Sequence, residues 1–297
     1  MLGELYTPSG MALETAKAVL GVDNPHAVNV ALGCPNGCVY CYGPLASRQG
    51  REKYSTPRLP KKDPVDLIKR QIDKGLKVDG VFMSFLTDPY LPQLEAQTEE
   101  LVYYLREQGI PTATLSKLGT STCFGNMNGM TIVSPYKEFS SKYERGVPSP
   151  QDRILKLGEA LPHYVWVSME PWPVSDIFAY TLQDILNFWE DLSFVGFIVL
   201  GKWNYEPRAR TEKARKEYAE IVPLFEDFCN DHGIRYHVKS DTLRFIGRDV
   251  PPEVERMVVK CCGSNMVERV NFDGTPIYWC VSCGKKIPRT SKKEISE

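Results

Sequence analysis

Short apolar runs rich in β-branched residues alternate with longer amphipathic stretches over most of this chain. The runs have the length of buried strands, and the stretches between them repeat apolar residues at helical spacing. We expect seven strands, at residues 27–32, 80–85, 112–116, 130–133, 164–169, 194–200 and 235–239. We expect helices between them, at 64–74, 93–108, 151–161, 175–190 and 211–231. This order predicts an α/β fold in which helices cover a parallel sheet.

Residues at the ends of the expected helices support these bounds. A capping side chain stands before a proline at two of the starts, Asp63-Pro64 and Ser149-Pro150. Glycines stand where three helices should end, at Gly75, Gly109 and Gly233. The pattern stops after about residue 250. We therefore expect a main domain over residues 1–249 and a cysteine-rich module with a polar tail over residues 250–297.

The composition excludes several classes of protein. A chain of 297 residues that is 42% hydrophobic and 25% charged buries a large core, unlike a disordered or disulfide-only protein. Its 36 basic residues nearly balance 37 acidic ones, so no chain-wide basic field attracts nucleic acid. The start lacks the features of a secretory signal and no apolar run is long enough to span a membrane, so we expect a cytoplasmic protein. The nine cysteines then favour metal binding or catalysis over disulfides.

The first cysteine group is the segment GCPNGCVYCYG at residues 33–43, where Cys34, Cys38 and Cys41 follow the first expected strand. Three thiolates in a C-x3-C-x2-C spacing can each bind a different iron of a cube-shaped 4Fe-4S cluster, which leaves the fourth iron open. A structural zinc site takes four protein ligands, and no nearby cysteine or histidine completes the set. We therefore expect an iron–sulfur cluster whose open iron takes an exogenous ligand.

This segment resembles the radical S-adenosylmethionine (SAM) superfamily, whose members hold a 4Fe-4S cluster with the same spacing after the first barrel strand. The resemblance implies a partial (β/α)6 barrel of the TIM type with its site at the carboxyl ends of the strands. It also implies SAM as cofactor and an electron donor such as a ferredoxin or a flavodoxin. One electron would cleave SAM to methionine and a 5'-deoxyadenosyl radical that abstracts hydrogen from a substrate.

Further motifs resemble the spore photoproduct lyase-like branch of that superfamily, and residues 143–153 resemble its loop and helix after strand four. The resemblance implies that two tyrosines beside Cys41 surround the cluster and cofactor, and that polar residues at successive strand ends contact SAM. We also expect a lysine among them to pair with the methionine carboxylate. The candidate cofactor-binding residues are Tyr40, Tyr42, Thr87, Asp88, Ser116, Lys117 and Ser134.

One departure from the branch bears on the reaction. Authentic lyases carry a hydrogen-donating cysteine three residues before the aspartate, and here that position is Phe85. Because phenylalanine cannot return a hydrogen atom, we do not expect the repair reaction, and Tyr90 becomes the candidate catalytic hydrogen donor. The substrate is unidentified, with nucleic acid ranked first. The alternative is a noncatalytic iron–sulfur or zinc-binding protein associated with nucleic acid.

The second cysteine group favours a zinc-ribbon-like module. A Cys-x2-Cys-Gly motif is typical of a zinc knuckle, and a hairpin turn signal precedes it. The other pair departs from the pattern, because its two cysteines are adjacent. A four-cysteine zinc site is preferred, while a three-cysteine zinc site, a second iron–sulfur cluster and reduced thiols stay open. The candidate ligands are Cys261, Cys262, Cys280 and Cys283.

Overall fold

The computed structural model describes residues 2–160 and 164–250, and beyond them the backbone of five short strands. The chain divides into two compact units, Met1–Asp249 and Val250–Glu297. In the second unit, β8 pairs antiparallel with β9, and β10, β11 and β12 form an antiparallel sheet. Their bounds are β8 Lys260–Cys261, β9 Ser264–Asn265, β10 Val267–Val270, β11 Pro276–Trp279 and β12 Lys286–Pro288.

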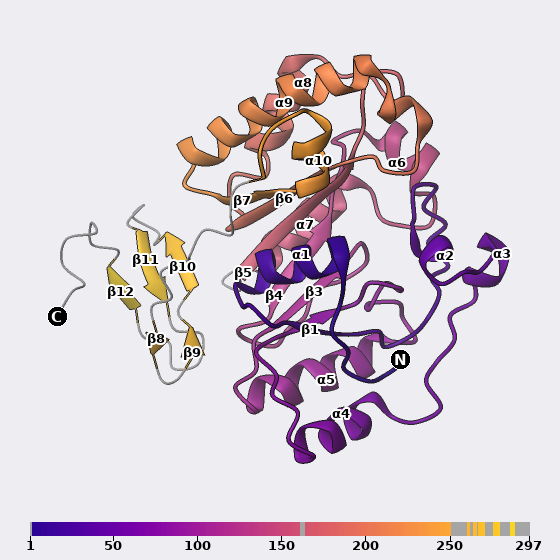
Figure 1. The fold of residues 1–297 in the computed structure, drawn as a ribbon, viewed down its shortest axis with the longest axis vertical. Helices are drawn as coiled ribbons and strands as arrows, with labels where there is room; N and C mark the ends of the chain where they lie inside the picture. The colour runs from indigo at the N-terminus through magenta and orange to yellow at the C-terminus, as the bar shows by residue number, and fades with distance from the viewer. Residues whose placement is uncertain are drawn as a thin grey trace. The chain divides into compact units, whose positions relative to one another are not determined.

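The first unit is built on a sheet of seven parallel strands whose order in space follows their order in the chain (Figure 1). Their bounds are β1 His26–Val28, β2 Val81–Met83, β3 Thr112–Ser116, β4 Met127–Thr131, β5 Tyr164–Trp172, β6 Phe197–Lys202 and β7 Arg235–Val238. All seven predicted strands are confirmed. This sequential parallel order agrees with a partial TIM-type barrel. The sheet has one strand more than the (β/α)6 arrangement, because β7 pairs with β6 along its length.

All five predicted helices are present, and one of them starts well after its predicted first residue, 175. Its first residue is Leu182, because the Thr181 side chain caps the helix in a reciprocal pair with Asp184. The five are α4 Pro64–Asp73, α5 Glu95–Glu107, α7 Pro150–Glu159, α8 Leu182–Glu190 and α9 Glu212–Asp231. Others were not predicted, namely α1 Gly10–Leu20, α2 Gly43–Ala46, α3 Arg51–Tyr54, α6 Lys137–Tyr143, the 3-10 turn η1 Pro207–Arg210 and α10 Ser240–Phe245.

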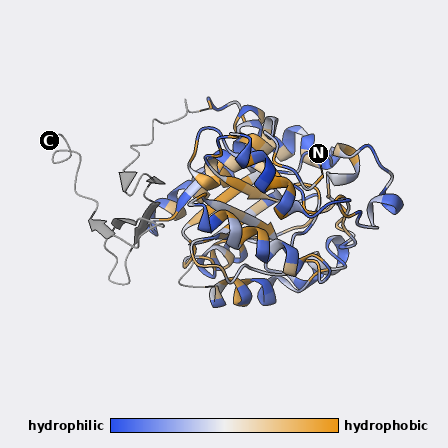
Figure 2. Cartoon of the chain, turned by 90° about the horizontal axis from the view of Figure 1, so that it is seen from below, coloured by the Kyte–Doolittle hydropathy of each residue, from blue (hydrophilic) through white to orange (hydrophobic). Residues whose placement is uncertain are grey.

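The hydrophobic core lies between the outer face of the sheet and the helices that cover it. Ile68 of α4 and Leu101 of α5 pack in one cluster with Val81 of β2. Trp189 of α8 and Phe225 of α9 belong to a second cluster, with ring centroids 5.6 Å apart. In Figure 2 the central strands are mostly hydrophobic, whereas the surrounding helices carry hydrophilic residues. Burial of these helix faces gives the sheet its outer layer.

Successive side chains of a strand point to opposite faces of the sheet, so every second residue lies on the inner face. Trp166 of β5 lies there, fully buried, with its ring 5.9 Å from that of Phe82 of β2. Its indole nitrogen donates to the Met127 carbonyl oxygen at 3.2 Å. A Cβ atom on Gly129 of β4 would lie 2.1 Å from the Trp166 ring, so only glycine leaves room for the indole.

Helix α1 crosses the inner face and connects the region of β7 to β2 (Figure 1). The Lys239 ammonium, just after β7, donates to the Met11 carbonyl oxygen at 3.1 Å and to the Thr15 hydroxyl at 2.6 Å. Glu14 accepts from the Ser240 backbone at 2.7 Å and lies 2.7 Å from His237. The helix therefore closes the inner face with polar contacts at the carboxyl end of β7.

Gly129→Ala should destabilise the protein by about 1–3 kcal/mol, because the added methyl group overlaps the buried Trp166 ring. Gly158→Ala is the matched control, since Gly158 lies in α7 and a Cβ there meets nothing within 4 Å. Alanine at that helical position should instead stabilise by about 0.5–1 kcal/mol. Urea unfolding measures both. Equal effects of the two substitutions would contradict the packing described.

Glu14 should contribute a pH-dependent part of the stability. Burial alone would raise the pKa of its carboxyl, but hydrogen bonds from His237 and Ser240 outweigh burial and lower the pKa to about 2. Because this pKa lies below the unfolded value of about 4.3, the contribution is complete above that pH and is lost as the pH falls toward 2.

Glu14→Gln should therefore lower the free energy of unfolding by about 1–2 kcal/mol at pH 6, and the difference from wild type should shrink below pH of about 4. Thermal and urea unfolding across this range measure the difference. Glu220→Gln, at an exposed position of α9, is the control and should show no such convergence. A wild-type advantage that stays constant down to pH of about 2 would refute the role assigned to Glu14.

Candidate functional site

The loop that carries the first three cysteines follows β1 and is held against the segment after β2. Gly33 has a φ of +113°, and its backbone N–H donates to the Leu86 carbonyl at 3.0 Å. A Cβ atom there would lie 2.6 Å from the Tyr54 carbonyl oxygen, so this close approach requires glycine. The next backbone N–H, of Cys34, donates to that same oxygen at 2.8 Å. The first cysteine is thus positioned by the end of α3.

The far side of the cysteine loop docks on residues 143–146, between α6 and α7. The Val39 N–H donates to the Tyr143 carbonyl at 2.9 Å, and the Gly146 N–H donates to the Asn36 carbonyl at 3.1 Å. The backbones approach so closely that a Cβ on Gly146 would lie 2.7 Å from that oxygen. Part of the segment that resembles the lyase-like branch therefore supports the cysteine loop.

The three thiols of this loop are free, with Cys38 buried and the other two partly exposed. Burial raises the pKa of the Cys34 thiol, and it raises that of Cys38 to about 11, reinforced by Glu144 and the other cysteines against the opposing effect of Lys117. The Gly43 N–H points at Cys41 Sγ, 3.4 Å away. Such N–H···S contacts are typical of sulfur ligands in iron–sulfur sites.

The donor set fits a cluster of several irons. Three sulfur atoms from one loop are the ligands that iron–sulfur clusters prefer, and their mutual influence on the pKa of Cys38 shows that they share one neighbourhood. Among residues 2–160 and 164–250, no three Cys, His, Asp or Glu side chains are arranged to hold a single metal ion. A cluster in which each thiolate binds its own iron does not require that arrangement.

Asp88 joins the cysteine loop to the ends of β2 and β3. Its buried carboxylate accepts hydrogen bonds from the Asn36 amide at 3.2 Å and from the Ser116 hydroxyl at 2.6 Å. It also accepts from the backbone N–H groups of Tyr90 at 3.0 Å and Lys117 at 2.9 Å. All four donors come from the protein itself. In this structure Asp88 and Ser116 therefore organise the strand ends on which the cysteine loop rests.

Thr87 and Tyr42 also contact the loops around the cysteines. The Thr87 hydroxyl is buried and donates to the Gly33 carbonyl at 2.7 Å. The Tyr42 hydroxyl donates to the Phe85 carbonyl at 2.6 Å, which joins the loop to the segment after β2. Ser134, buried beyond the end of β4, accepts from the Tyr136 N–H at 3.1 Å. Thr87 and Ser134 thus lie after the ends of β2 and β4, whereas Tyr42 stands at the start of α2, and all three have backbone groups as partners.

Lys117 and Tyr40 are partly buried and belong to a charged cluster beside Cys38. The Lys117 ammonium lies 5.3 Å from the centre of the Tyr40 ring, and the Tyr40 hydroxyl donates to Glu144. Burial alone would lower the pKa of Lys117, but Cys38 and Glu144 raise it overall, so the side chain carries a positive charge. In the described part of the chain, no acceptor takes a hydrogen bond from this ammonium. It remains available to an anionic group at the loop.

Glu144 and Arg153 form a buried ion pair that supports this cluster, each about 1% exposed. Arg153 also donates to the Thr131 carbonyl at the end of β4. Burial would raise the pKa of Glu144, yet Arg153 and Lys117 lower it overall. Breaking such a pair typically costs about 3–5 kcal/mol, because one charge stays buried without a partner. Sequence reasoning missed Glu144, although it lies in the segment flagged by resemblance.

The candidate hydrogen donor points toward a helix. Tyr90 is buried, and its hydroxyl donates to Glu99 of α5 at 2.9 Å. Glu99 also accepts from the Thr122 N–H at 3.1 Å. Phe85, at the position of the lyase cysteine, stacks on Phe82 with ring centroids 4.5 Å apart. The structure therefore brings the backbone of Tyr90 to Asp88 but engages its hydroxyl with α5 and the loop after β3.

Three basic residues before and within α9 form exposed ion pairs. Arg208 lies 2.8 Å from Glu206, Arg215 lies 2.6 Å from Glu212, and Lys213 lies 2.5 Å from Asp176. These pairs reduce the positive charge that this stretch offers to a nucleic acid backbone.

The second cysteine group lies largely outside the described residues. Cys261 ends β8, whose backbone pairs with β9, and nothing further is described at Cys262, Cys280 and Cys283. The zinc site proposed for these four residues stays a prediction. No helix in residues 2–160 and 164–250 has the length and apolar character needed to cross a membrane.

Comparison with known proteins finds similarity of fold. No family model and no curated protein sequence matches the chain. Its fold is similar to that of Streptococcus suis SuiB, with a TM-score of 0.52 and 10% identity over 79% of this chain and 53% of that one. The structures of SuiB bound to S-adenosylmethionine and to the precursor peptide SuiA give TM-scores of 0.49 and 0.48 at 10% and 11% identity, covering 71% of this chain in each case. The chain spans about half the length of SuiB.

Asp88→Asn should destabilise the protein by about 1–3 kcal/mol, because the new amide nitrogen faces donors and leaves at least one of them unpaired. Asp227→Asn, at an exposed position of α9, is the control and should change stability by less than about 0.5 kcal/mol. Urea unfolding measures both. If the two variants unfold alike, Asp88 does not hold the strand ends together.

Proposed function

We propose that this protein is a radical SAM enzyme in which Cys34, Cys38 and Cys41 hold a 4Fe-4S cluster. The observation that carries the proposal is the placement of three free thiols in one loop after the first strand of a parallel, barrel-type sheet. When bound, the cluster and SAM supply reductive cleavage to methionine and a 5'-deoxyadenosyl radical. The cleavage also requires one electron from an external donor, such as a ferredoxin or a flavodoxin.

The residues around the loop have three tasks in this proposal. Asp88 fixes the loop through Asn36 and sets the ends of β2 and β3 in one position. Lys117 presents a partly buried positive charge beside Cys38 to the carboxylate of SAM, because the described residues supply no acceptor for its ammonium. Tyr40 is held by Glu144 and covers the loop from the side of β6.

The remaining candidates fit narrower roles. Thr87, Ser116 and Ser134 keep hydroxyl groups at the carboxyl ends of three neighbouring strands, where a ligand of a barrel-type fold binds. Tyr42 follows Cys41 in the chain and ties the loop to the Phe85 carbonyl. Tyr90 as hydrogen donor is the weakest of these assignments, since its hydroxyl is engaged by Glu99. The lyase-like branch rests on the sequence motifs, and Phe85 separates this chain from the repair reaction.

Two observations favour an enzyme over a noncatalytic metal protein bound to nucleic acid. A partly buried cation beside the cysteine loop, with no hydrogen-bond acceptor among the described residues, suits a site that binds an anionic cofactor. Three cations of the basic stretch that would hold a nucleic acid backbone, Arg208, Lys213 and Arg215, are instead paired with acidic residues. We therefore expect the substrate of the reaction to bind at the carboxyl ends of the barrel strands.

Anaerobically reconstituted protein, reduced with dithionite in the presence of SAM, should release 5'-deoxyadenosine. Cys38→Ala should reduce the release to the level without protein, because the cluster loses one of its three ligands. Cys229→Ala removes a buried thiol of α9 and should retain the release. Chromatography measures the product, and iron and sulfide analysis measures the cluster. An intact cluster without 5'-deoxyadenosine would favour the noncatalytic alternative.

A further inference from the structure

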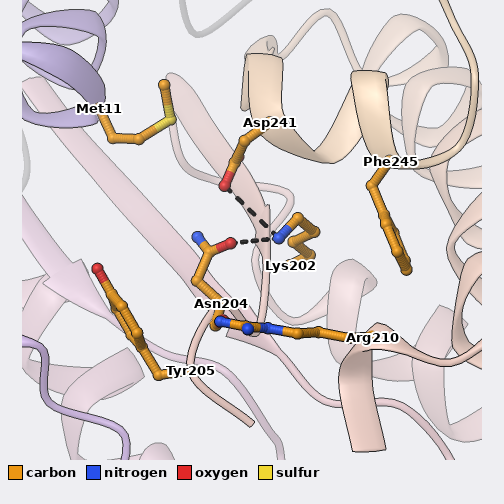
Figure 3. A pocket seen from close by; sticks show the side chains of 7 residues that line it. All are labelled: Met11, Lys202, Asn204, Tyr205, Arg210, Asp241 and Phe245. Carbon is orange, nitrogen blue, oxygen red and sulfur yellow. Dashed lines mark hydrogen bonds and ion pairs between the residues drawn. The ribbon is translucent and has the colours of Figure 1, made fainter. Parts of the chain in front are cut away.

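A cavity of about 420 Å³ opens beside the carboxyl ends of β6 and β7 (Figure 3). Its volume is within the range of small-molecule sites. Side chains from α1, β6, η1 and α10 surround it, so it is built from segments far apart in the chain. The lining residues are Met11, Lys202, Asn204, Tyr205, Arg210, Asp241 and Phe245.

The cationic side of the cavity has unused hydrogen-bond donors. The Lys202 ammonium donates to the Asn204 side chain and lies 3.8 Å from Asp241, beyond hydrogen-bond distance. Arg210 uses its Nε and one terminal nitrogen on the Asn204 carbonyl oxygen. In the described part of the chain, its other terminal nitrogen has no acceptor. These two cations are therefore able to bind an oxyanion together.

The side of the cavity next to Lys202 also has an unused acceptor. Asp241 Oδ2 lies 3.8 Å from the Lys202 ammonium and receives no hydrogen bond from the described residues. Asp241 Oδ1 is fully buried, so Oδ2 is the oxygen that can accept a hydrogen bond from a ligand. The lining carries two positive charges and one negative charge, which suits a monoanion better than a dianionic phosphate. Met11, Tyr205 and Phe245 supply the apolar and aromatic surface between the charged groups.

The cavity is joined to the cysteine loop through neighbouring residues of one strand end. Trp203 follows Lys202 and packs edge-on against Tyr40 of the loop, with ring centroids 5.5 Å apart. Through this contact, the chain segment that lines the cavity also touches the loop that carries the proposed cluster.

We propose that this cavity binds the substrate through an α-amido carboxylate, with Lys202 and Arg210 on the carboxylate and Asp241 on the amide N–H. An acylated amino acid and the carboxyl terminus of a peptide share this chemistry. The aromatic and apolar lining favours a large apolar side chain on the bound residue. As a substrate site, the cavity rests on the proposed function. As a binding site, it is independent of the cluster and of SAM.

Binding of N-acetyl-L-phenylalanine to the purified full chain, without cluster or SAM, tests the proposal. Its size predicts a Kd on the order of 1 mM in saturation-transfer NMR or calorimetry. N-acetyl-L-phenylalaninamide, which lacks the carboxylate, should bind about tenfold more weakly. A tripeptide ending in phenylalanine should bind as well as the acid if peptides are accepted, and should be excluded if only small molecules are.

Variants locate the site. Lys202→Met and Arg210→Gln should each weaken binding of the acid about tenfold. Lys213→Met removes an exposed charge of α9 outside the cavity and should leave binding unchanged. Unfolding midpoints establish that each variant is folded. The proposal would be overturned by equal binding of the acid and the amide, or by tighter binding of phenyl phosphate than of the acid. It would also be overturned if Lys213→Met lost as much binding as Lys202→Met, or if no saturable binding were found. Because no SAM is used, these failures are separate from absence of 5'-deoxyadenosine.

Discussion

The hydrogen bonds to the Asp88 carboxylate connect the cysteine loop with the strand ends that surround it. One carboxylate accepts from the loop after β1, from its own loop after β2 and from the end of β3. A buried carboxylate is stable only when donors replace its hydration, so these segments are constrained to one arrangement. The relative position of Cys34 and Lys117 follows from that arrangement, and so does the chemistry proposed for the loop.

The strands β2, β5 and β6 could be predicted because they form largely apolar runs buried on both faces, a pattern that depends only on local sequence. Helix α1 could not, since its buried residues include small ones such as Thr15, Ala16 and Ala18, and its polar partners lie after residue 235. The start of α8 was predicted too early for a related reason. A cap at Thr181 determines that start, and apolar spacing before it suggested a longer helix.

The candidate site, too, could be predicted only in part from the sequence. The cysteine spacing and the polar strand ends could be found in the sequence, because each is a local motif. The partners of those groups could not, since Asn36 and Ser116 reach Asp88 across 52 and 28 residues. Glu144 is the clearest omission, because an acidic residue in a loop carries no signal of its burial until Arg153 is brought to it. Tyr90 shows the converse, as its hydroxyl turns to a helix nine residues later.

The charges around the cysteine loop argue for a metal-bearing occupant. Three thiolates bring three negative charges into a loop where burial already raises the pKa of Cys34 and Cys38. The protein opposes them with Lys117, while Arg153 is committed to Glu144 and Asp88 is satisfied by neutral donors. The raised pKa of Cys38 keeps its free thiol protonated, so thiolates form in this loop only when a bound cation replaces the protons. The iron of the proposed cluster would supply that positive charge.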